Sequence, residues 1–585
     1  MREMHNGSLF DSTEAMSLNW PDSADLLTSI LSADFTNLPA LEALPSQTVA
    51  PTESQSDHLS PWLTTDGNTQ HRGTHAVQNL TQMINSLSAD VTSEAQTTGF
   101  TTVFLDGCLH MFFKQFLPSM PVVHAATFVF KDWTHPLLLN AIALGSLFMG
   151  KKDYVLKGEI LWRLAHTAVA TSWQTLIKHR GPYDTCGGIQ LVLTALLGQI
   201  YAMLSEVFHS LGFFWARWAG MYELEDQEEG IAFDFLDSHE VLERKWRVWA
   251  ARETQLRALL GHYVLDGQIS MYSGGPTCQR HTSHSLPMPT EADIFEATDA
   301  ETWRDKMIAR SQKRPPFAQL FSSVMSENVH VRHLGSSLAL LTASVTLEGF
   351  KSFMAESPVS GTNVIGVPSR QDISRGLARF YLFAEQSLSM SLMNKRVTLL
   401  RWHTIGLDFA IDFNWFCRKL CQEYEVEQRI VGGRKKPPLD LESWLRSPKG
   451  RMGLLHAISI REIIQEIPAS HAHTINGPMA VFSAAILYCG FLLGGISTIS
   501  RPDRCSWDSI LLLDIDTVAE NIETDSDTQV RQYLTGTLSG LQRQENLLYE
   551  VNVFLTFLEN LGRTWGVSTH MHRVVEQLVS RCGLG

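Results

Sequence analysis

Cysteine is scarce in this chain, and none of the spacings in which cysteine usually carries structure is present. The 585 residues contain eight cysteines, and the first of them is Cys108. They follow no framework spacing, and no apolar signal segment opens the chain. The sequence therefore predicts an intracellular, reduced protein and excludes a disulfide-stapled secreted domain.

Basic residues are also in short supply. Lys and Arg number 47 against 61 Asp and Glu, which gives a formal net charge of −14. Within residues 1–100, only Arg2 and Arg72 face twelve Asp and Glu, so most of the excess negative charge lies there. Because neutralisation of phosphates by Lys and Arg dominates nucleic-acid affinity, this balance argues against the chain wrapping DNA or RNA by itself.

Catalytic motifs are missing as well. The chain has no Gly-x-Ser-x-Gly elbow, no His-Glu-x-x-His helix and no glycine-rich dinucleotide turn. Residues 145–152 imitate a phosphate loop, but Lys152 stands where Ser or Thr must hold magnesium, and no strand leads into the segment. The sequence predicts no catalytic residue and no cofactor-binding residue, and hence no enzyme.

Candidate metal ligands are incomplete. Cys417 and Cys421 lie one helical turn apart, but no second pair at a useful spacing completes the four ligands that zinc needs. Three histidine pairs lack a carboxylate or a third histidine and are interpreted as ordinary surface or loop residues: His281 with His284, His471 with His473, and His570 with His572. No metal-ligating residue is predicted.

Helical periodicity is what the sequence has in abundance. From about Thr101, apolar residues recur at three- and four-residue spacing, and Gly and Pro separate the periodic segments. The segments are 104–116, 136–148, 159–177, 189–204, 207–224, 241–272, 331–354, 370–393, 398–425, 452–467, 478–496 and 530–561. No repeat of fixed period appears. We therefore predict an all-α fold, one irregular multi-helix array.

One segment of this array is long enough to cross a bilayer. Residues 478–500 carry no charged side chain, but Pro478, Gly490 and Gly494 interrupt them. The segment stands alone in a chain whose composition is otherwise typical of globular proteins. We expect a helix buried in a large helical core and no membrane partner.

Residues 1–100 differ in composition from the rest. Ser, Thr, Asp, Asn, Gln and Pro are dense from 45 to 96, with too few apolar residues to offset the entropy of ordering, so a disordered acidic arm is predicted.

An island at residues 20–35 departs from the arm around it. Asp22 or Ser23 can cap a short helix there that places Leu27, Ile30 and Leu31 on one face. Such a mixture of acidic and apolar residues suits an activation helix that binds a coactivator groove. A surface helix or a plain linker is the alternative interpretation.

Two blocks carry a resemblance to a known family. The first reads FLPSMPVVHAATF over residues 116–128 and HPLLLNAIALGSLF over residues 135–148. The second consists, in chain order, of Trp246, Trp249, Glu253, Arg257, residues 263–266, residues 274–276, Leu286, Pro287 and Trp303. Together, over about residues 104–303, they resemble the middle homology region of fungal zinc-finger transcription factors.

The resemblance implies a nuclear regulator of RNA polymerase II transcription whose helical regulatory domain controls activity through intramolecular inhibition, effector sensing or partner binding. Coactivators or the transcription machinery are the implied partners. It divides the chain into an arm (1–100), the homology region (101–305) and a C-terminal helical part of the same domain (306–585). It leaves homodimer formation, target genes, effector and sign of regulation open.

Members of this family carry a zinc cluster or a pair of zinc fingers ahead of the homology region, whereas no cysteine here precedes Cys108. The acidic helix is similar to segments that follow the finger pair in the two-Cys, two-His subgroup. We expect a finger domain that has been lost, spliced out or mis-annotated, and zinc and DNA binding are implied only through it or through a DNA-bound partner.

Two short basic clusters lie in predicted loops, at 434–436 and at Arg310, Lys313 and Arg314. They suit nuclear import if exposed, or are ordinary solvated surface. Glu253 and Arg257, at i,i+4, are expected to pair beside aromatic residues as packing. The alternative functions are a cofactor that lacks DNA binding and modulates another regulator, and an all-α enzyme acting on a hydrophobic small molecule.

Overall fold

The structure is a computed structural model, and it describes only part of the chain. The described residues are 23–32, 89–203, 216, 221, 233, 237–279, 286–310, 314, 316–326, 339–356, 367–387, 390–433, 440–468, 474–502, 505, 507–512, 525–536 and 543–582. The statements that follow concern these residues.

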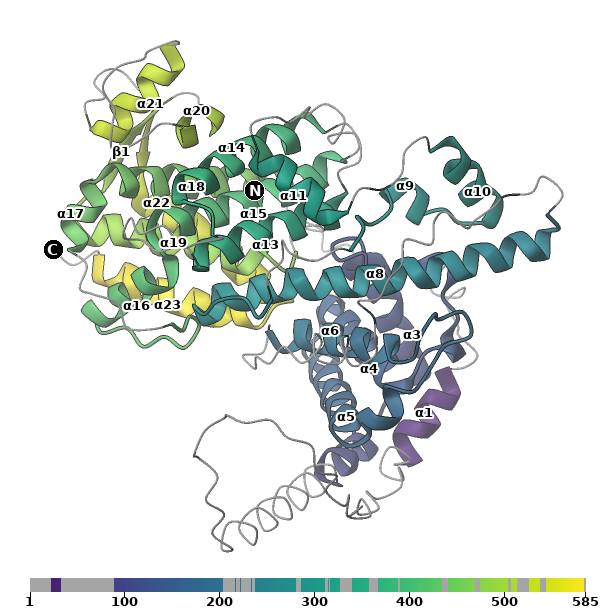
Figure 1. The fold of residues 1–585 in the computed structure, drawn as a ribbon. Coiled ribbons are helices and arrows are strands. Elements are labelled where there is room, and N and C mark those ends of the chain that lie inside the picture. Colours follow the sequence, from purple (N-terminus) through teal and green to yellow (C-terminus); the bar gives the residue numbers. More distant parts are fainter. Residues whose placement is uncertain are drawn as a thin grey trace, which may run out of the picture.

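The prediction of an irregular all-α array is confirmed (Figure 1). The first elements are α1 (Ser23–Ser32), α3 (Thr102–Met111), η2 (Phe112–Phe116), η3 (Ala125–Thr127), η4 (Phe130–Asp132), α4 (His135–Ser146), η5 (Leu147–Met149), α5 (Lys152–Leu176), α6 (Ile189–Met203) and α8 (His239–Ser273). They are followed by α9 (Ala292–Phe295), α10 (Ala300–Ala309), α11 (Phe317–Met325), α13 (Leu340–Glu356), α14 (Arg370–Gln386), α15 (Leu392–Ile411) and α16 (Phe413–Glu423). The last elements are α17 (Leu441–Arg446), α18 (Pro448–Glu466), α19 (Gly477–Leu493), β1 (Thr498–Arg501), α20 (Trp507–Leu512), α21 (Asp525–Thr535), β2 (Arg543–Asn546), α22 (Leu547–Leu561) and α23 (Val567–Cys582).

One apolar core runs through the array, from Leu26 in α1 to Leu578 in α23. Two helices lie at its centre because their sequences are apolar on every face. Helix α4 is buried from Pro136 to Ser146 and packs on α3, α5 and α6, whereas α19 is buried from Gly477 to Phe491 and packs on α15, α18, α22 and α23. The expectation that residues 478–500 supply a core helix is confirmed. Across the described part of the chain, no helix is both long and apolar enough to span a bilayer.

Helix α8 is the longest element and lies between the two halves of the array (Figure 1). Its 35 residues span about 52 Å at 1.5 Å per residue. Ser238 caps its N-terminus, and Gly274 ends it in the left-handed region with a φ of 63°. Helix α8 packs on α6 in one direction and on α13 in the other, so it joins the homology region to the C-terminal helices.

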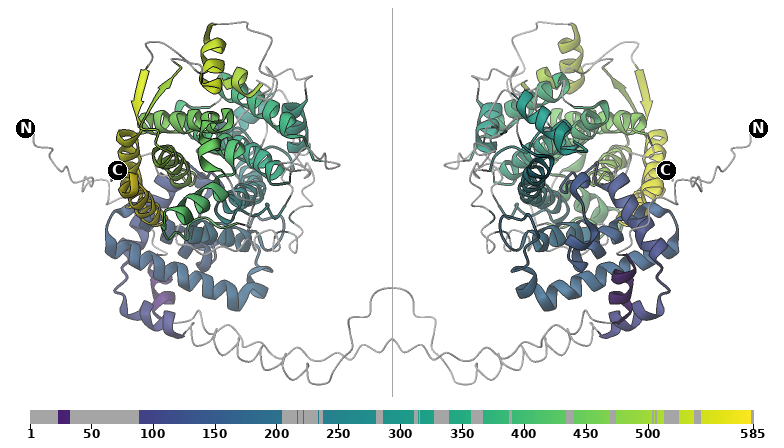
Figure 2. Two further views of the ribbon diagram at one scale, coloured as in Figure 1. Left: turned by 90° about the vertical axis from the view of Figure 1, so that its left-hand side faces the viewer. Right: turned by 90° about the vertical axis from the view of Figure 1, so that its right-hand side faces the viewer.

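Helix α1 confirms that the acidic island at 20–35 forms a helix. Its Leu26 and Ile30 are buried, and the helix packs on α3, at the lower edge in Figure 2. Of the three residues predicted on one face, Ile30 is buried and Leu27 is half-buried against the core, whereas the side chain of Leu31 lies outside the described residues. The structure also describes residues 89–100 of the predicted arm, of which 89–97 are helical and Val91, Ala95 and Phe100 are buried; the remaining arm residues lie outside the description.

A small antiparallel ribbon interrupts the helices of the C-terminal half. Strand β1 pairs with β2 so that Thr498 faces Asn546 and Arg501 faces Arg543, and both strands stand at the upper edge in Figure 2. The Asn546 side chain accepts hydrogen bonds from the backbone N–H groups of Leu548 and Tyr549, so β2 leads directly into the cap of α22.

Candidate functional site

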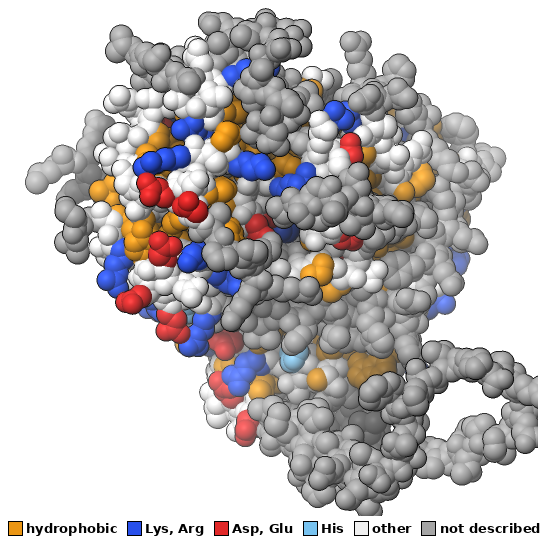
Figure 3. All heavy atoms as spheres, turned by 60° about the vertical axis from the view of Figure 1, so that its left-hand side comes forward, with side chains coloured by type: hydrophobic (Ala, Val, Ile, Leu, Met, Phe, Trp, Pro, Cys, Tyr) orange, Lys and Arg blue, Asp and Glu red, His pale blue; other side chains and the backbone are white. Residues whose placement is uncertain are grey.

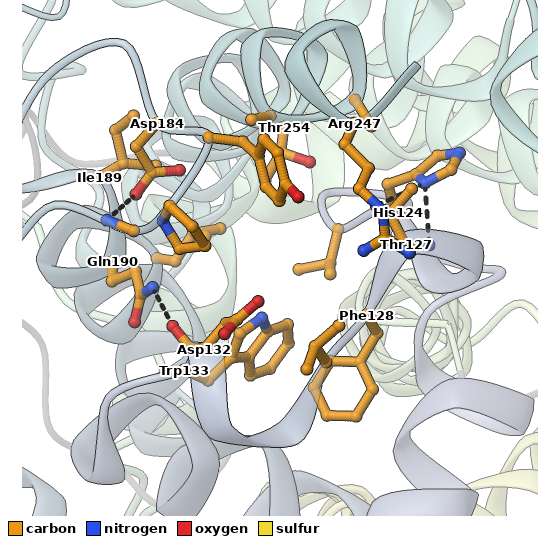
Figure 4. A pocket seen from close by; sticks show the side chains of 18 of the residues that line it. His124, Thr127, Phe128, Asp132, Trp133, Asp184, Ile189, Gln190, Arg247 and Thr254 are labelled. Atoms are coloured by element: carbon orange, nitrogen blue, oxygen red, sulfur yellow. Dashed lines mark hydrogen bonds between the residues drawn. The ribbon is translucent and has the colours of Figure 1, made fainter. Parts of the chain in front are cut away.

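A small cavity lies between the first homology block and helix α8 (Figure 4). Its walls come from residues 123–133, from the loop at 181–184, from the start of α6 and from one face of α8. Phe128 and Trp133 form one wall, and Arg247 and Thr254 of α8 lie opposite them. The cavity volume is about 90 Å³, well below the roughly 300–1,000 Å³ of typical small-molecule sites.

Gln190 fixes the irregular chain on one side of this cavity. Its Oε1 accepts a hydrogen bond from the backbone N–H of Thr134 at 2.7 Å, and its Nε2 donates to the carbonyl of Asp132 at 2.8 Å. A single amide at the start of α6 therefore holds the turn that leads into α4. Because the side chain is buried and both of its ends are bonded, it orders the homology block and leaves no free group for chemistry.

The charged groups around the cavity are held locally. Asp184 Oδ2 accepts from the backbone N–H of Gly181 at 2.9 Å, and burial raises the pKa of this carboxyl. Arg247 pairs with Glu243 at 2.8 Å, and its guanidinium lies 5.9 Å from the centre of the Tyr183 ring. The rim therefore combines a carboxyl of weakened acidity with a guanidinium that already has a carboxylate partner.

His124, from the first block, sits beside the cavity as a neutral imidazole. Its Nδ1 accepts from the backbone N–H of Thr127 at 3.3 Å and lies 2.9 Å from the Thr127 hydroxyl. Aromatic rings surround it edge-on, with centroids 5.5 Å away for Trp246 and 5.1 Å away for Phe295. Burial, reinforced by the charge of Arg257, lowers the pKa of His124 to about 4.

Next to His124, Glu253 is the centre of a buried charge cluster. Its Oε1 accepts from Arg257 Nε and from the backbone N–H of Thr290, both at 2.8 Å. Its Oε2 accepts from Arg314 Nη1 at 2.8 Å and from the Thr290 hydroxyl at 3.0 Å. Burial alone would raise the pKa of Glu253, but the two guanidinium groups and the backbone N–H hold it at about 2.

Arg257 connects this cluster to the first block. Its Nη1 donates to the carbonyl of Pro121 at 3.1 Å, and its Nη2 donates to the carbonyl of Thr290 at 2.7 Å. The guanidinium lies 3.5 Å from the centre of the Phe295 ring, a cation–π contact. The expected pairing of Glu253 with Arg257 beside aromatic residues is confirmed, and the pair joins the two homology blocks.

The Glu253 cluster is suited to holding chain segments and poorly suited to catalysis. The carboxylate accepts four hydrogen bonds, so its lone pairs are occupied and its charge is neutralised. The aromatic residues around it form a satellite core of their own, which includes Trp246, Trp249 and Trp303. We infer a rigid joint between helix α8 and the loops that flank it.

The other candidate residues do not converge on a site. Cys417 and Cys421 are buried on α16, and burial raises the pKa of the Cys417 thiol, which disfavours the thiolate that zinc binds. His570 is exposed on α23, and His572 lies one turn from Glu576. Within the described ranges, no group of three or more His, Cys, Asp or Glu could hold a metal ion.

Several singled-out residues lie outside the described ranges. They are His281, His284, His471, His473 and the basic cluster 434–436. The segment 145–152 is described: it forms the end of α4, the turn η5, a left-handed Gly150 and the start of α5. Its backbone therefore follows helices and their caps, not a phosphate loop.

The expectation of an exposed basic cluster at 310–314 is wrong for Arg314. Its side chain is 9% exposed and is held by Glu253, because a guanidinium was needed to neutralise that buried carboxylate. Arg310 lies 3.7 Å from Glu291. Lys313 lies outside the described residues.

The surface charge of the C-terminal half is mixed on the face that Figure 3 shows. Lys and Arg side chains alternate there with Asp and Glu, and apolar patches lie between them. On that face, the described residues present no stripe of a single charge sign. This agrees with the acidic composition and gives no phosphate-binding surface there.

Sequence reasoning missed the residues that tie distant segments together. Gln190 and Arg314 each act across more than fifty residues of chain, to Thr134 and to Glu253 respectively. Their one sequence signal is a polar residue inside, or just before, an apolar helix. That signal indicates burial but does not identify a partner.

Comparison with protein families identifies the region that contains this site. Residues 109–338 match the family described as the fungal specific transcription factor domain. The matched range includes both homology blocks, the cavity and the Glu253 cluster. Comparisons with curated proteins and with solved structures gave no match.

Proposed function

Because residues 109–338 form a fungal specific transcription factor domain, we propose that this chain regulates transcription by RNA polymerase II and acts in the nucleus. The observation that carries the proposal is the position of the Glu253 cluster. It joins the two blocks of that domain through Pro121, Thr290 and Arg314, so the matched range is built as one unit.

The domain works in this proposal as a regulatory scaffold that contacts coactivators or the transcription machinery. A net charge of −14 makes DNA contact by the chain alone unfavourable, so DNA is reached through a finger domain or a DNA-bound partner. The role is not enzymatic, which agrees with the Glu253 carboxylate, whose hydrogen-bonding capacity is used by Arg257, Thr290 and Arg314.

The proposed regulatory domain extends past the matched range to the end of α23. The apolar core that begins in the homology region continues without a break through α13, α15, α18 and α22, and α8 contributes to both parts. Residues 101–305 and 306–585 are then two parts of one body, against which α1 and residues 89–100 of the predicted arm also pack.

Helix α1 is the proposed activation segment of that arm. Asp25 is exposed, as a soluble acidic segment requires, but Leu26 and Ile30 are buried where the helix packs on α3. Binding to a coactivator groove through the same apolar face requires α1 to leave α3 first. Replacing Leu26 with Asp in a reporter fusion tests whether that face matters for output.

The experiment for the main proposal uses the full chain fused to a heterologous DNA-binding module. We expect the fusion to change a reporter at least severalfold relative to the module alone, and the untagged chain to accumulate in nuclei. An inert fusion together with an extranuclear chain would contradict the proposal.

A cofactor that lacks DNA binding is the second candidate, and the acidic balance favours it. Chromatin occupancy separates the two. A sequence-specific factor keeps its occupancy when other regulators are deleted one at a time, whereas a cofactor loses it with its partner.

A further inference from the structure

A second and larger cavity lies in the C-terminal half, outside the matched domain. Its volume is about 430 Å³, within the roughly 300–1,000 Å³ of small-molecule sites. Its walls come from α14, α15 and α18, and from Arg501, Pro502, Cys505 and Trp507 in and between β1 and α20. Elements from three stretches of the chain therefore enclose one space.

Two buried histidines lie at the base of this cavity. His403 Nδ1 is 3.1 Å from His456 Nδ1, and only His403 lines the space. His403 is 3% exposed and His456 is fully buried. Burial lowers the pKa of His403 to about 3 and lowers that of His456 as well, so both rings are neutral and one donates its hydrogen to the other.

The direction of that hydrogen bond follows from the surroundings of His456. Its Nε2 has no partner among the described residues and packs on Gly406, where an added Cβ would lie 2.6 Å from it. A buried N–H without an acceptor is rarer than a buried acceptor without a donor. We therefore place the proton of His456 on Nδ1. His403 then accepts on Nδ1 and carries its own proton on Nε2.

His403 Nε2–H is consequently a donor at the edge of the cavity. None of the described residues hydrogen-bonds to this atom, although the side chain is more than nine-tenths buried. Such a donor needs an acceptor from water or from a ligand.

The walls next to His403 are aromatic and apolar. Trp507 stacks on His456, with centroids 4.2 Å apart and an angle of 28°, and meets the His403 ring edge-on at 4.8 Å. Leu399 and Ile458 contribute aliphatic surface. A flat ligand would find an indole beside the imidazole donor.

The charges around the cavity cancel. Arg396 pairs with Glu466 at 3.0 Å, and Arg501 pairs with Glu462 at 2.7 Å. The remaining lining charges are Lys395, whose Nζ donates to the Glu385 carbonyl, and the Glu385 carboxylate. With three cations and three carboxylates, the cavity has no net charge that would select an ion.

We propose that this cavity binds a small molecule without net charge that has a flat ring system against Trp507 and a carbonyl-type acceptor at His403 Nε2. The proposal stands on the cavity and its lining, and it does not depend on the proposed role in transcription.

The first test uses 7-diethylamino-4-methylcoumarin, a neutral planar dye with a ring carbonyl and environment-sensitive fluorescence. Titration into the full chain should give saturable binding. The anionic 7-diethylaminocoumarin-3-carboxylate should bind about tenfold more weakly, because the lining charges cancel and both lining arginines are already paired with glutamates. Absence of saturable binding by the neutral dye, or preference for the anionic one, overturns the proposal.

Two matched variants locate the bound dye. Ser459→Phe adds a ring inside the cavity, because Ser459 is half-buried and lines it, whereas Gln465→Phe adds the same ring at an exposed position of the same helix. We expect Ser459→Phe to raise the Kd of the dye by about tenfold or more. Gln465→Phe should leave the Kd within about twofold of the parental value. Equal binding by parent and Ser459→Phe places the dye elsewhere and overturns the proposal.

A third variant tests the donor. His403→Phe keeps an aromatic ring but removes the N–H, and we expect about fivefold weaker binding of the neutral dye. Since this change also removes the acceptor for His456, circular dichroism should first confirm that the variant folds. Unchanged affinity in a folded variant removes His403 from the site and contradicts the proposed mode of binding.

Discussion

Two buried glutamates fix helix α8 to its surroundings, and they do so in different ways. Glu253 lies on α8 and takes Arg257 from its own helix, but its other partners, Thr290 and Arg314, come from segments outside helices. Glu348 lies on α13, and its partners Arg401 and Gln268 both come from long helices. The first glutamate orders irregular chain, whereas the second locks one helix to another.

The difference follows from what each half of α8 packs against. Toward its N-terminus, α8 meets turns and short helices, so an ion pair with several backbone contacts supplies the fixed geometry that a helix face cannot. Toward its C-terminus, α8 meets α13 at close range. A Cβ on Gly267 would lie 2.0 Å from Glu348 Oε2, so only glycine leaves room for the carboxylate there.

The largest loss of stability is expected on removal of Glu348, the carboxylate that neutralises a buried arginine. Glu348→Leu leaves Arg401, which is 2% exposed, without a counter-ion, and we expect a loss of about 3–5 kcal/mol in the free energy of unfolding. Urea unfolding followed by circular dichroism measures it. The double variant with Arg401→Met should recover part of the loss, because it removes the stranded charge. A double variant as unstable as the sum of the single variants would show that packing, not charge, is at stake.

Glu253→Gln is expected to cost less, about 2–3 kcal/mol. The amide keeps an acceptor for Arg257, and that guanidinium retains the carbonyls of Pro121 and Thr290 and the face of Phe295. The same urea experiment ranks the two variants. If Glu253→Gln lost more free energy of unfolding than Glu348→Leu, the comparison would be reversed. The contacts to irregular chain would then stabilise α8 more than the contact between helices.

Acid should destabilise the protein through its buried histidines. The pKa of His124 is about 4 in the folded chain and about 6.5 when unfolded, so its contribution is fully present above pH 6.5 and is lost as the pH falls toward 4. At pH 5 this amounts to about 2 kcal/mol, since each pH unit is worth about 1.4 kcal/mol. In His124→Asn, the free energy of unfolding should depend less steeply on pH between 6.5 and 4. The slope should be smaller by the equivalent of one bound proton, or about 1.4 kcal/mol per pH unit. His239→Asn is the opposite case, because the Glu301 carboxylate raises the pKa of His239: it should remove a stabilisation that is present below pH 6.5 and is lost as the pH rises above it.

Glycine substitutions test the close approach on the α13 side. Gly267→Ala must displace the Glu348 carboxylate, and we expect a loss of about 1–2 kcal/mol. Gly107→Ala is the matched control, because it lies in α3 with its nearest contact, Met149 Cε, at 3.7 Å. That change should be neutral or stabilise by about 0.5 kcal/mol, since Ala favours a helix over Gly. A neutral Gly267→Ala would mean that α8 and α13 can separate without cost.

Much of the fold was predictable from local pattern, and the site was not. The apolar spacing predicted the helices, and the i,i+4 spacing of Glu253 and Arg257 predicted their pairing. Arg314, Gln190 and the pair of Arg401 with Glu348 depend on which helices meet in space, and no local period encodes that. The exposed basic cluster at 310–314 was mispredicted for the same reason, because the carboxylate that draws Arg314 inward is 61 residues away.

The smallest effect should come from an ion pair that matches the Glu253 pair in geometry but not in surroundings. Glu442 and Arg446 lie at i,i+4 on α17 with an N–O distance of 2.9 Å, against 2.8 Å for Glu253 and Arg257, but their side chains are 69% and 63% exposed. Glu442→Gln should change the free energy of unfolding by less than about 0.5 kcal/mol, because water replaces the lost contact. The two variants, compared in one urea series, separate distance from burial. Equal losses would mean that the short N–O distance alone sets the energy, whereas a loss confined to Glu253→Gln assigns it to the two arginines and the threonine that close off the buried carboxylate from solvent.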